Sequence, residues 1–163
     1  MISEQRIFQA YYTKSEPIVS YMVDLLELNG TETIFGIPGA QIYPLFEGIY
    51  NSSIELIVPR HEQSAAYMAM GYAKSTGKTG VFSVVPGPGI LNTTAALCTA
   101  MGNCSSIVGL TGQVPSSFMG QGRGHLHELS DQAGTLKTII KDAITIGIWI
   151  IWSSAKCFFS TIC

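Results

Sequence analysis

The sequence has little charge. Only 12% of its 163 residues are charged, about half the share usual in globular proteins. Disordered chains combine low hydrophobicity with high charge, so a content of 47% hydrophobic residues excludes a disordered chain. The formal net charge of -2 gives no sign of a basic surface for nucleic acid or an anionic membrane, and we expect neither partner. So little charge also indicates that another chain covers part of the surface.

The sequence also lacks paired metal-ligand cysteines and a signal peptide. No Cys-x-x-Cys pair occurs, so we expect no zinc site. Residues 1–14 are polar and mixed, without the apolar core of a secretory signal. We therefore expect a cytoplasmic chain with reduced thiols, in which each cysteine is a small buried hydrophobe. The cysteines are Cys98, Cys104, Cys157 and Cys163.

Long hydrophobic runs are absent except near the end of the chain. Residues 143–155 carry no charge. This run is shorter than the about 20 apolar residues that a membrane helix needs. Two interpretations remain for it: a buried edge strand, or the aberrant end of a truncated product.

Short apolar strands alternate with amphipathic helices through most of the chain. The predicted strands span 33–36, 54–58, 81–85 and 106–110. The predicted helices span 17–28, 41–50, 61–75 and 91–101. This alternation is typical of right-handed βαβ units, and strands that are apolar throughout favour a parallel sheet covered on both faces. We predict an α/β fold, a three-layer αβα domain with a mostly parallel sheet.

Three loops rich in glycine and proline follow predicted strands, at 36–39, 86–89 and 112–115. In a parallel sheet these loops meet at the carboxyl edge, where ligands bind. Glycines in the loop at 86–89 let the backbone approach a ligand closely. This loop matches neither a P-loop nor a dinucleotide fingerprint. The sequence therefore predicts a ligand site at the carboxyl edge.

Glu62 is the candidate acid of this site. It lies at the start of a predicted helix, within the run Arg60-His61-Glu62-Gln63, where the helix dipole favours a carboxylate. Small and apolar residues follow it, which indicates a partly dry site. From its position alone, a surface acid that caps the helix fits as well.

Five motifs in order give the chain a resemblance to a known family. They are Gly36-Ile37-Pro38-Gly39, Arg60-His61-Glu62-Gln63, residues 65–73 (AAYMAMGYA), Gly87-Pro88-Gly89-Ile90-Leu91-Asn92 and Gly112-Gln113-Val114-Pro115. Over residues 15–141 the chain resembles the N-terminal pyrimidine-binding domain of thiamine-diphosphate-dependent enzymes, the group of acetolactate synthase and the 2-keto acid decarboxylases. We accordingly expect this domain at 15–141 and an atypical apolar tail at 142–163.

The resemblance implies that Glu62 is catalytic. The matching glutamate hydrogen-bonds N1′ of the cofactor's aminopyrimidine, which favours the 4′-imino tautomer that removes the thiazolium C2 proton. The resemblance also implies that Pro88 and Asn92 line the pyrimidine pocket. Pro38 and Gly39 match the loop beside the cofactor in the facing subunit. The implied cofactor is thiamine diphosphate, bound by its pyrimidine end only.

The sequence departs from the family in two places. Acetolactate synthases usually have Phe-Gln-Glu where this chain has Leu126-His127-Glu128, so a synthase-type acceptor pocket is not implied. His127 and Gln113 are the candidate substrate residues, although a loop or capping role fits His127 equally. No Gly-Asp-Gly motif occurs, so magnesium is expected only through a missing domain or a partner, and no metal site in this chain.

Three functions remain open at this point. The chain is a fragment of a thiamine-diphosphate enzyme, the small subunit of a split keto acid decarboxylase, or a non-catalytic binding or regulatory module. The first is our expectation: half of a site for decarboxylation or carboligation of 2-keto acids, inactive without a diphosphate-binding domain. That domain would come from a homo- or hetero-oligomer.

Overall fold

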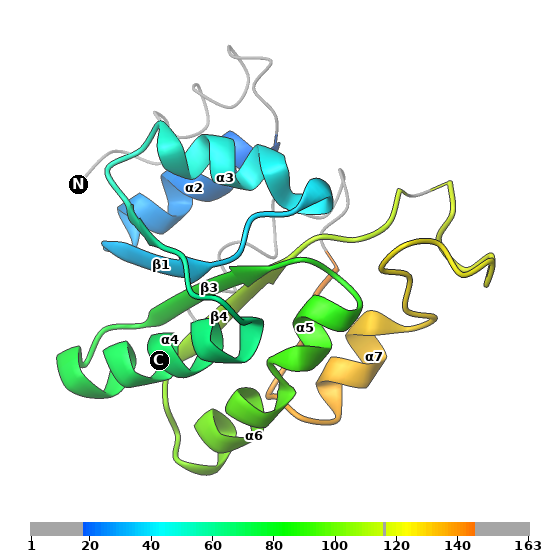
Figure 1. Ribbon diagram of the computed structural model, residues 1–163. Helices are drawn as coiled ribbons and strands as arrows, with labels where there is room; N and C mark the ends of the chain where they lie inside the picture. Colours follow the sequence, from blue (N-terminus) through cyan, green and yellow to red (C-terminus); the bar gives the residue numbers. More distant parts are fainter. Residues whose placement is uncertain (1–17, 116, 146–163) are drawn as a thin grey trace.

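The computed structural model describes residues 18–115 and 117–145, which form a parallel sheet covered on both faces. Its strands pair in the order β2-β1-β3-β4, and every pairing is parallel. Figure 1 shows the sheet between two layers of helices. The predicted three-layer α/β fold is therefore confirmed. The strands are β1 (Thr33–Gly36), β2 (Glu55–Ile57), β3 (Gly80–Val84) and β4 (Ile107–Thr111).

The helices divide between the two faces of the sheet. On one face α2 (Ile18–Leu28) packs against α3 (Tyr43–Tyr50), which follows the short helix η1 (Ala40–Ile42). The other face carries α4 (Glu62–Thr76), α5 (Pro88–Asn92), α6 (Thr94–Gly102) and α7 (Gln132–Lys137).

Two apolar cores result from the alternation of side chains along the strands. Ile34 of β1 and Val81 of β3 lie in the core under α2 and α3. Phe35 and Phe82, the next residue along each strand, lie in the opposite core with the alanines of α4. Burying a large apolar side chain such as Phe82 stabilises the fold by roughly 1.5–3 kcal/mol.

Small side chains bring α4 close to the sheet. Ala65, Ala66 and Ala69 are fully buried against it. A Cβ at Gly80 would overlap the carbonyl of Ala69, so β3 begins directly under the helix. The helix ends at Gly77, whose φ of 71° places it in the left-handed region.

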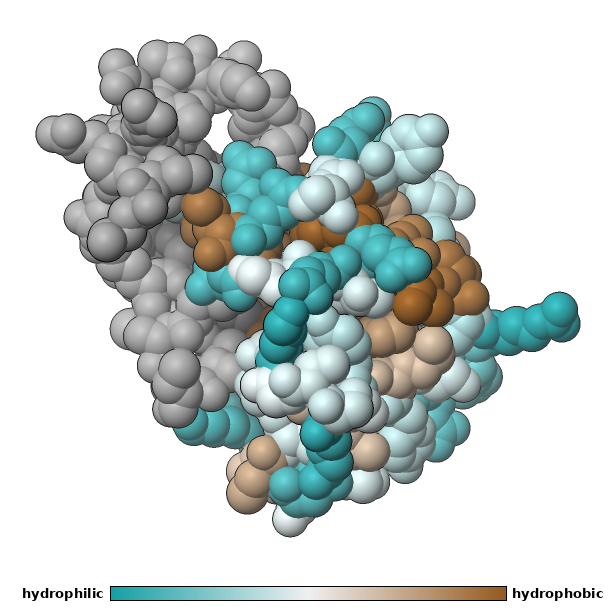
Figure 2. Space-filling view, turned by 90° about the vertical axis from the view of Figure 1, so that its left-hand side faces the viewer, coloured by the Kyte–Doolittle hydropathy of each residue, from teal (hydrophilic) through white to brown (hydrophobic). Residues whose placement is uncertain are grey.

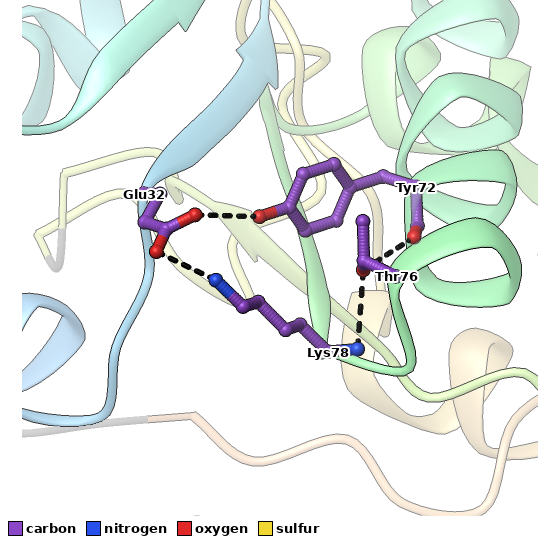
Figure 3. Close-up of polar contacts among 4 residues, drawn as sticks. All are labelled: Glu32, Tyr72, Thr76 and Lys78. Carbon is purple, nitrogen blue, oxygen red and sulfur yellow. Dashed lines mark hydrogen bonds and ion pairs between the residues drawn. The ribbon is translucent and has the colours of Figure 1, made fainter.

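A polar cluster joins the end of α4 to the beginning of β1 (Figure 3). Lys78 Nζ lies 2.6 Å from Glu32 Oε1, and the Tyr72 hydroxyl donates to Glu32 Oε2 at 3.4 Å. The Thr76 hydroxyl donates to the Tyr72 carbonyl. Figure 2 shows the face on the left-hand side of Figure 1, where hydrophilic and hydrophobic residues are interspersed.

The predicted helix at 91–101 is two helices in the structure. Helix α5 begins at Pro88, three residues earlier than predicted, because Gly87 precedes it as the N-cap. The buried Thr93 separates α5 from α6, and its hydroxyl donates to the Ile90 carbonyl at 2.7 Å. Threonine hydroxyls compete in this way with the helical backbone.

Several other expectations from the sequence were wrong or lie outside the described residues. Cys98 and Cys104 are exposed, so the expectation that they are buried hydrophobes was wrong. Helix α7 was not predicted. The apolar tail lies outside the described residues from 146 onward, and the boundaries at 15–141 and 142–163 stay predictions. Within the part of the chain described, no helix is long and apolar enough to cross a membrane.

Candidate functional site

The carboxyl edge of the sheet has a switch point between β1 and β3. Strand β1 pairs with β2 on one side and with β3 on the other, and the chain leaves β1 and β3 toward opposite helical layers. Ligands bind at such points in α/β sheets. The loops that follow β1 and β3 begin close together, since the N–H of Ile37, after β1, donates to the carbonyl of Ser83 in β3 at 3.0 Å.

Val85 is the side chain on which the two loops meet. A Cβ at Gly39, after β1, would overlap Val85 Cγ1. A Cβ at Gly89, in α5, would come within 2.5 Å of Val85 Cγ2 and 3.9 Å of Glu62 Cγ. The missing side chains let both backbones lie against Val85. The sequence did not indicate Val85, because its contacts with Gly39 and Gly89 depend on how the two loops fold.

Glu62 is the first residue of α4, and two neighbours fix its position. His61 caps the helix, with its Nδ1 accepting from Gln63 N–H at 3.2 Å. Asn92, at the end of α5, donates from Nδ2 to Glu62 Oε2 at 3.1 Å. Within the described part of the chain, the other carboxylate oxygen has no hydrogen-bond partner. The structure thus joins two predicted site residues and leaves Oε1 available to a donor.

His127 lies at the same edge beside Gln41. Its Nδ1 is 2.9 Å from Gln41 Oε1, and Gln41 Nε2 faces the Leu126 carbonyl at 3.5 Å. His127 has a φ of 69°, which is uncommon for a residue other than glycine. Its carbonyl lies against Gly87. Sequence reasoning missed Gln41, since nothing in the local spacing relates it to a residue so far along the chain.

Gln132 connects two of the loops at this edge and was also missed as a site residue. Its side chain accepts from Gly87 N–H at 3.0 Å and donates to the Gly112 carbonyl at 3.1 Å. The residue is 8% exposed. The preceding Asp131, which caps α7, could have indicated the start of a helix here.

The glycine-rich stretch 120–124 closes on a carboxylate of the same chain. Glu128 accepts from the backbone N–H groups of His125 at 2.9 Å and Gly122 at 3.1 Å. These bonds, the His125 bond first, hold the pKa of Glu128 below its usual range. Backbone N–H groups of this kind can bind an anion, and here the carboxylate of Glu128 is the anion that they bind.

The remaining predicted residues lie near this edge without joining Glu62. Pro38 and Pro88 are exposed in the loop after β1 and at the start of α5. Gln113 Oε1 accepts from Val114 N–H of its own loop at 2.9 Å. The roles of these residues toward a ligand stay predictions. Among the described residues, no group of three or more His, Cys, Asp or Glu side chains could hold a metal ion.

A parallel α/β sheet with a switch point at its carboxyl edge is typical of a class of ligand-binding domains. The chain belongs to one family of this class: a family model described as "Thiamine pyrophosphate enzyme, N-terminal TPP binding domain" matches residues 18–135. Thiamine pyrophosphate is another name for thiamine diphosphate.

Similar proteins include synthases and a decarboxylase. The acetolactate synthase isozyme 2 large subunit of Escherichia coli is 41% identical over 100 residues, 61% of this chain and 18% of that protein. A probable 2-ketoarginine decarboxylase of Pseudomonas aeruginosa is 40% identical over 111 residues, 68% of this chain and 20% of that protein. The catalytic subunit of acetolactate synthase in Saccharomyces cerevisiae is 39% identical over 98 residues, 60% and 14% respectively. The chain spans one fifth or less of the length of these relatives.

Proposed function

We propose that this chain supplies the aminopyrimidine-binding half of a thiamine-diphosphate-dependent site that acts on 2-keto acids. The diphosphate and its magnesium would bind to a different domain, of the same longer protein or of a partner chain. Family membership supports the cofactor. The names of the relatives support a 2-keto acid substrate, by carboligation or decarboxylation.

The geometry of Glu62 carries the proposal. Its Oε2 accepts from Asn92, so the carboxylate is oriented while Oε1 remains available. An aminopyrimidine that is protonated at N1′ presents an N–H donor, which a carboxylate oxygen accepts well. Gly89 has no side chain, so the backbone of α5 lies directly against Val85 beside Glu62 and fixes the distance between this loop and the carboxylate. The residues present therefore fit the pyrimidine end of the cofactor.

Glu62 would hold a proton at N1′, and Asn92 would keep the carboxylate turned toward it. When bound, the cofactor supplies a nucleophilic thiazolium carbon for attack on the keto carbonyl. Pro38, Gly39 and Pro88 would border the ring, and His127 and Gln113 remain the candidates for contacting the keto acid.

Glu62→Gln in the assembled enzyme tests the role of the carboxylate. We expect hydrogen–deuterium exchange at C2 of bound thiamine diphosphate to slow by at least about 100-fold, the lower end for a positioned acid or base. The amide keeps the size of the side chain and removes its ability to hold a proton at N1′. Quenched-flow exchange followed by proton NMR measures the rate.

Glu32→Gln is the matched control, because Glu32 is an exposed glutamate at the opposite end of the sheet. We expect its exchange rate to equal that of the native enzyme. Unchanged exchange in Glu62→Gln would refute the proposed role, and equal slowing in both variants would indicate a general structural effect.

A further inference from the structure

We infer that Gln41 holds the neutral ring of His127 with its proton on Nδ1, so that Nε2 is the nitrogen left to accept a proton. The two side chains come from η1 and from the loop before α7, and Nδ1 lies 2.9 Å from Gln41 Oε1. The tautomer follows from their geometry alone. The inference rests on the proposed function only where it gives Nε2 a part in binding a keto acid.

The direction of the Gln41 amide decides which atom donates. The Leu126 carbonyl can only accept, and it faces Gln41 Nε2 at 3.5 Å. The amide oxygen is therefore the atom turned toward His127. Since an amide oxygen can only accept, His127 Nδ1 must carry the hydrogen of this bond. A neutral imidazole has one protonated nitrogen, which leaves the lone pair on Nε2.

Close backbone contacts hold both partners in place. A Cβ at Gly112 would come within 2.7 Å of the Gln41 carbonyl oxygen. A Cβ at Gly87 would come within 2.5 Å of the His127 carbonyl oxygen. The buried side chain of Gln132 hydrogen-bonds both glycines. The Gln41–His127 contact is therefore built on backbone that has little room to shift.

His61 provides the opposite case in the same molecule. Its Nδ1 accepts from Gln63 N–H at 3.2 Å, so in the neutral ring the proton lies on Nε2. His125, whose ring stacks on Phe118 with centroids 3.8 Å apart, is the third histidine of the chain. One spectrum of this protein should therefore contain two opposite tautomers with assigned structural causes.

The tautomer determines how His127 can act on a ligand. With Nδ1 engaged by Gln41, Nε2 can accept a hydrogen bond or take up a proton. Once protonated there, the ring donates from Nε2 to an anionic oxygen such as a keto acid carboxylate, and the Gln41 bond is unchanged. Gln41 is a positioning residue in this arrangement, because it acts only through His127.

Ring 15N NMR of the full chain, labelled at histidine and held in alkaline buffer where histidine is neutral, tests the inference. We expect the proton of His127 on Nδ1 and the proton of His61 on Nε2. Gln41→Met removes the amide at similar length, and His127 should then shift to the Nε2–H form that the free histidine side chain prefers. Gln41→Glu should retain the Nδ1–H form, because a carboxylate also only accepts.

Gln63→Met is the matched control, since Gln63 hydrogen-bonds His61 through its backbone N–H, and both tautomers should remain as in the native chain. An Nε2–H signal from native His127, or an unchanged tautomer in Gln41→Met, would overturn the inference. If Gln41→Met does not fold, the native and Gln41→Glu spectra still decide. No cofactor or substrate is present, so failure of the proposed role of Glu62 leaves this outcome unaffected.

Discussion

The two edges of the sheet are stabilised by different kinds of polar contact. At the amino edge, Glu32 and Lys78 form an ion pair whose side chains are 65% and 48% exposed (Figure 3). At the carboxyl edge, the neutral side chain of Gln132 joins the backbones of Gly87 and Gly112 and is almost fully buried. Water and salt ions can replace the partners of the first contact. The second has no replacement when one partner is lost.

This difference shows which edge of the sheet depends on specific pairing of its polar groups. An exposed ion pair contributes little to stability, because solvent screens it and the long side chains lose entropy. A buried amide that satisfies two backbone groups leaves both unpaired when it is removed. The edge that carries Glu62 and His127 is thus the edge with the more specific contacts.

Alanine at Gly87 should have the largest effect and should distinguish the two edges most clearly. Gly87 and Gly77 both have positive φ, 62° and 71°. Only Gly87 has a backbone atom, the His127 carbonyl, where a Cβ would go. We expect Gly87→Ala to lower the free energy of unfolding by about 3 kcal/mol or more, and Gly77→Ala by about 1 kcal/mol.

Urea denaturation of the full chain measures both changes. Gly77→Ala serves as the control, because it adds the same methyl group at positive φ in open space at the amino edge. Equal losses in the two variants would contradict the close approach of His127 to Gly87.

Gln132→Met should have the next largest effect. The substitution keeps an unbranched side chain but leaves the Gly87 N–H and the Gly112 carbonyl without their partner. We expect a loss of about 2 kcal/mol in the free energy of unfolding, measured by the same method. Lys78→Met, which removes the cation of the amino edge, should cost less. A larger loss for Lys78→Met would reverse the comparison.

The response of two glutamates to salt should be the smallest effect. Hydrogen bonding to Lys78 is the main cause of a lowered pKa at Glu32, and backbone N–H groups, that of His125 first, lower the pKa of Glu128. At about 1 M salt the screening length is about 3 Å. We expect the pKa of Glu32 to return toward its ordinary value while that of Glu128 stays low. Carboxyl 13C NMR titrations at low and high salt measure both.

The stability linked to these groups follows from the sign of the shifts. A carboxyl whose pKa is lower in the folded state stabilises it above the unfolded pKa, and the contribution fades as the pH falls through the folded pKa. At low salt both glutamates contribute in this way, and at high salt only Glu128 should. An equal salt response at Glu32 and Glu128 would show that backbone and side-chain donors do not differ here.

Much of the fold could be predicted from the sequence, because apolar strands and loop glycines are local signals. The start of α4 was predicted one residue early, at 61, and the boundaries of β1 follow from such signals. The split at Thr93 does not, since it depends on a side-chain hydroxyl that competes with the helix. The exposure of Cys98 does not either, because it depends on which side of α6 meets the sheet.

The candidate site, too, could be predicted only in part from the sequence. The motifs indicated Glu62 and Asn92, and the structure joins them by a hydrogen bond. Gln41 and Gln132 were not indicated, because a glutamine amide gives no local sign of its distant partner. Their contacts depend on how the loops after β1, β3 and β4 converge, which is a property of the assembled sheet.

The hydrogen bonds of the carboxyl edge also imply an order of assembly. The Asn92–Glu62 bond spans 30 residues, the Gln132–Gly87 bond 45, and the His127–Gln41 bond 86. The entropy lost on closing a loop grows with its length, so the longest contact closes at the greatest entropic cost. During synthesis, the pair Glu62–Asn92 can form as soon as α5 has emerged, whereas His127 must wait for a later segment. The acid of the candidate site is thus in place before the histidine that would face the substrate.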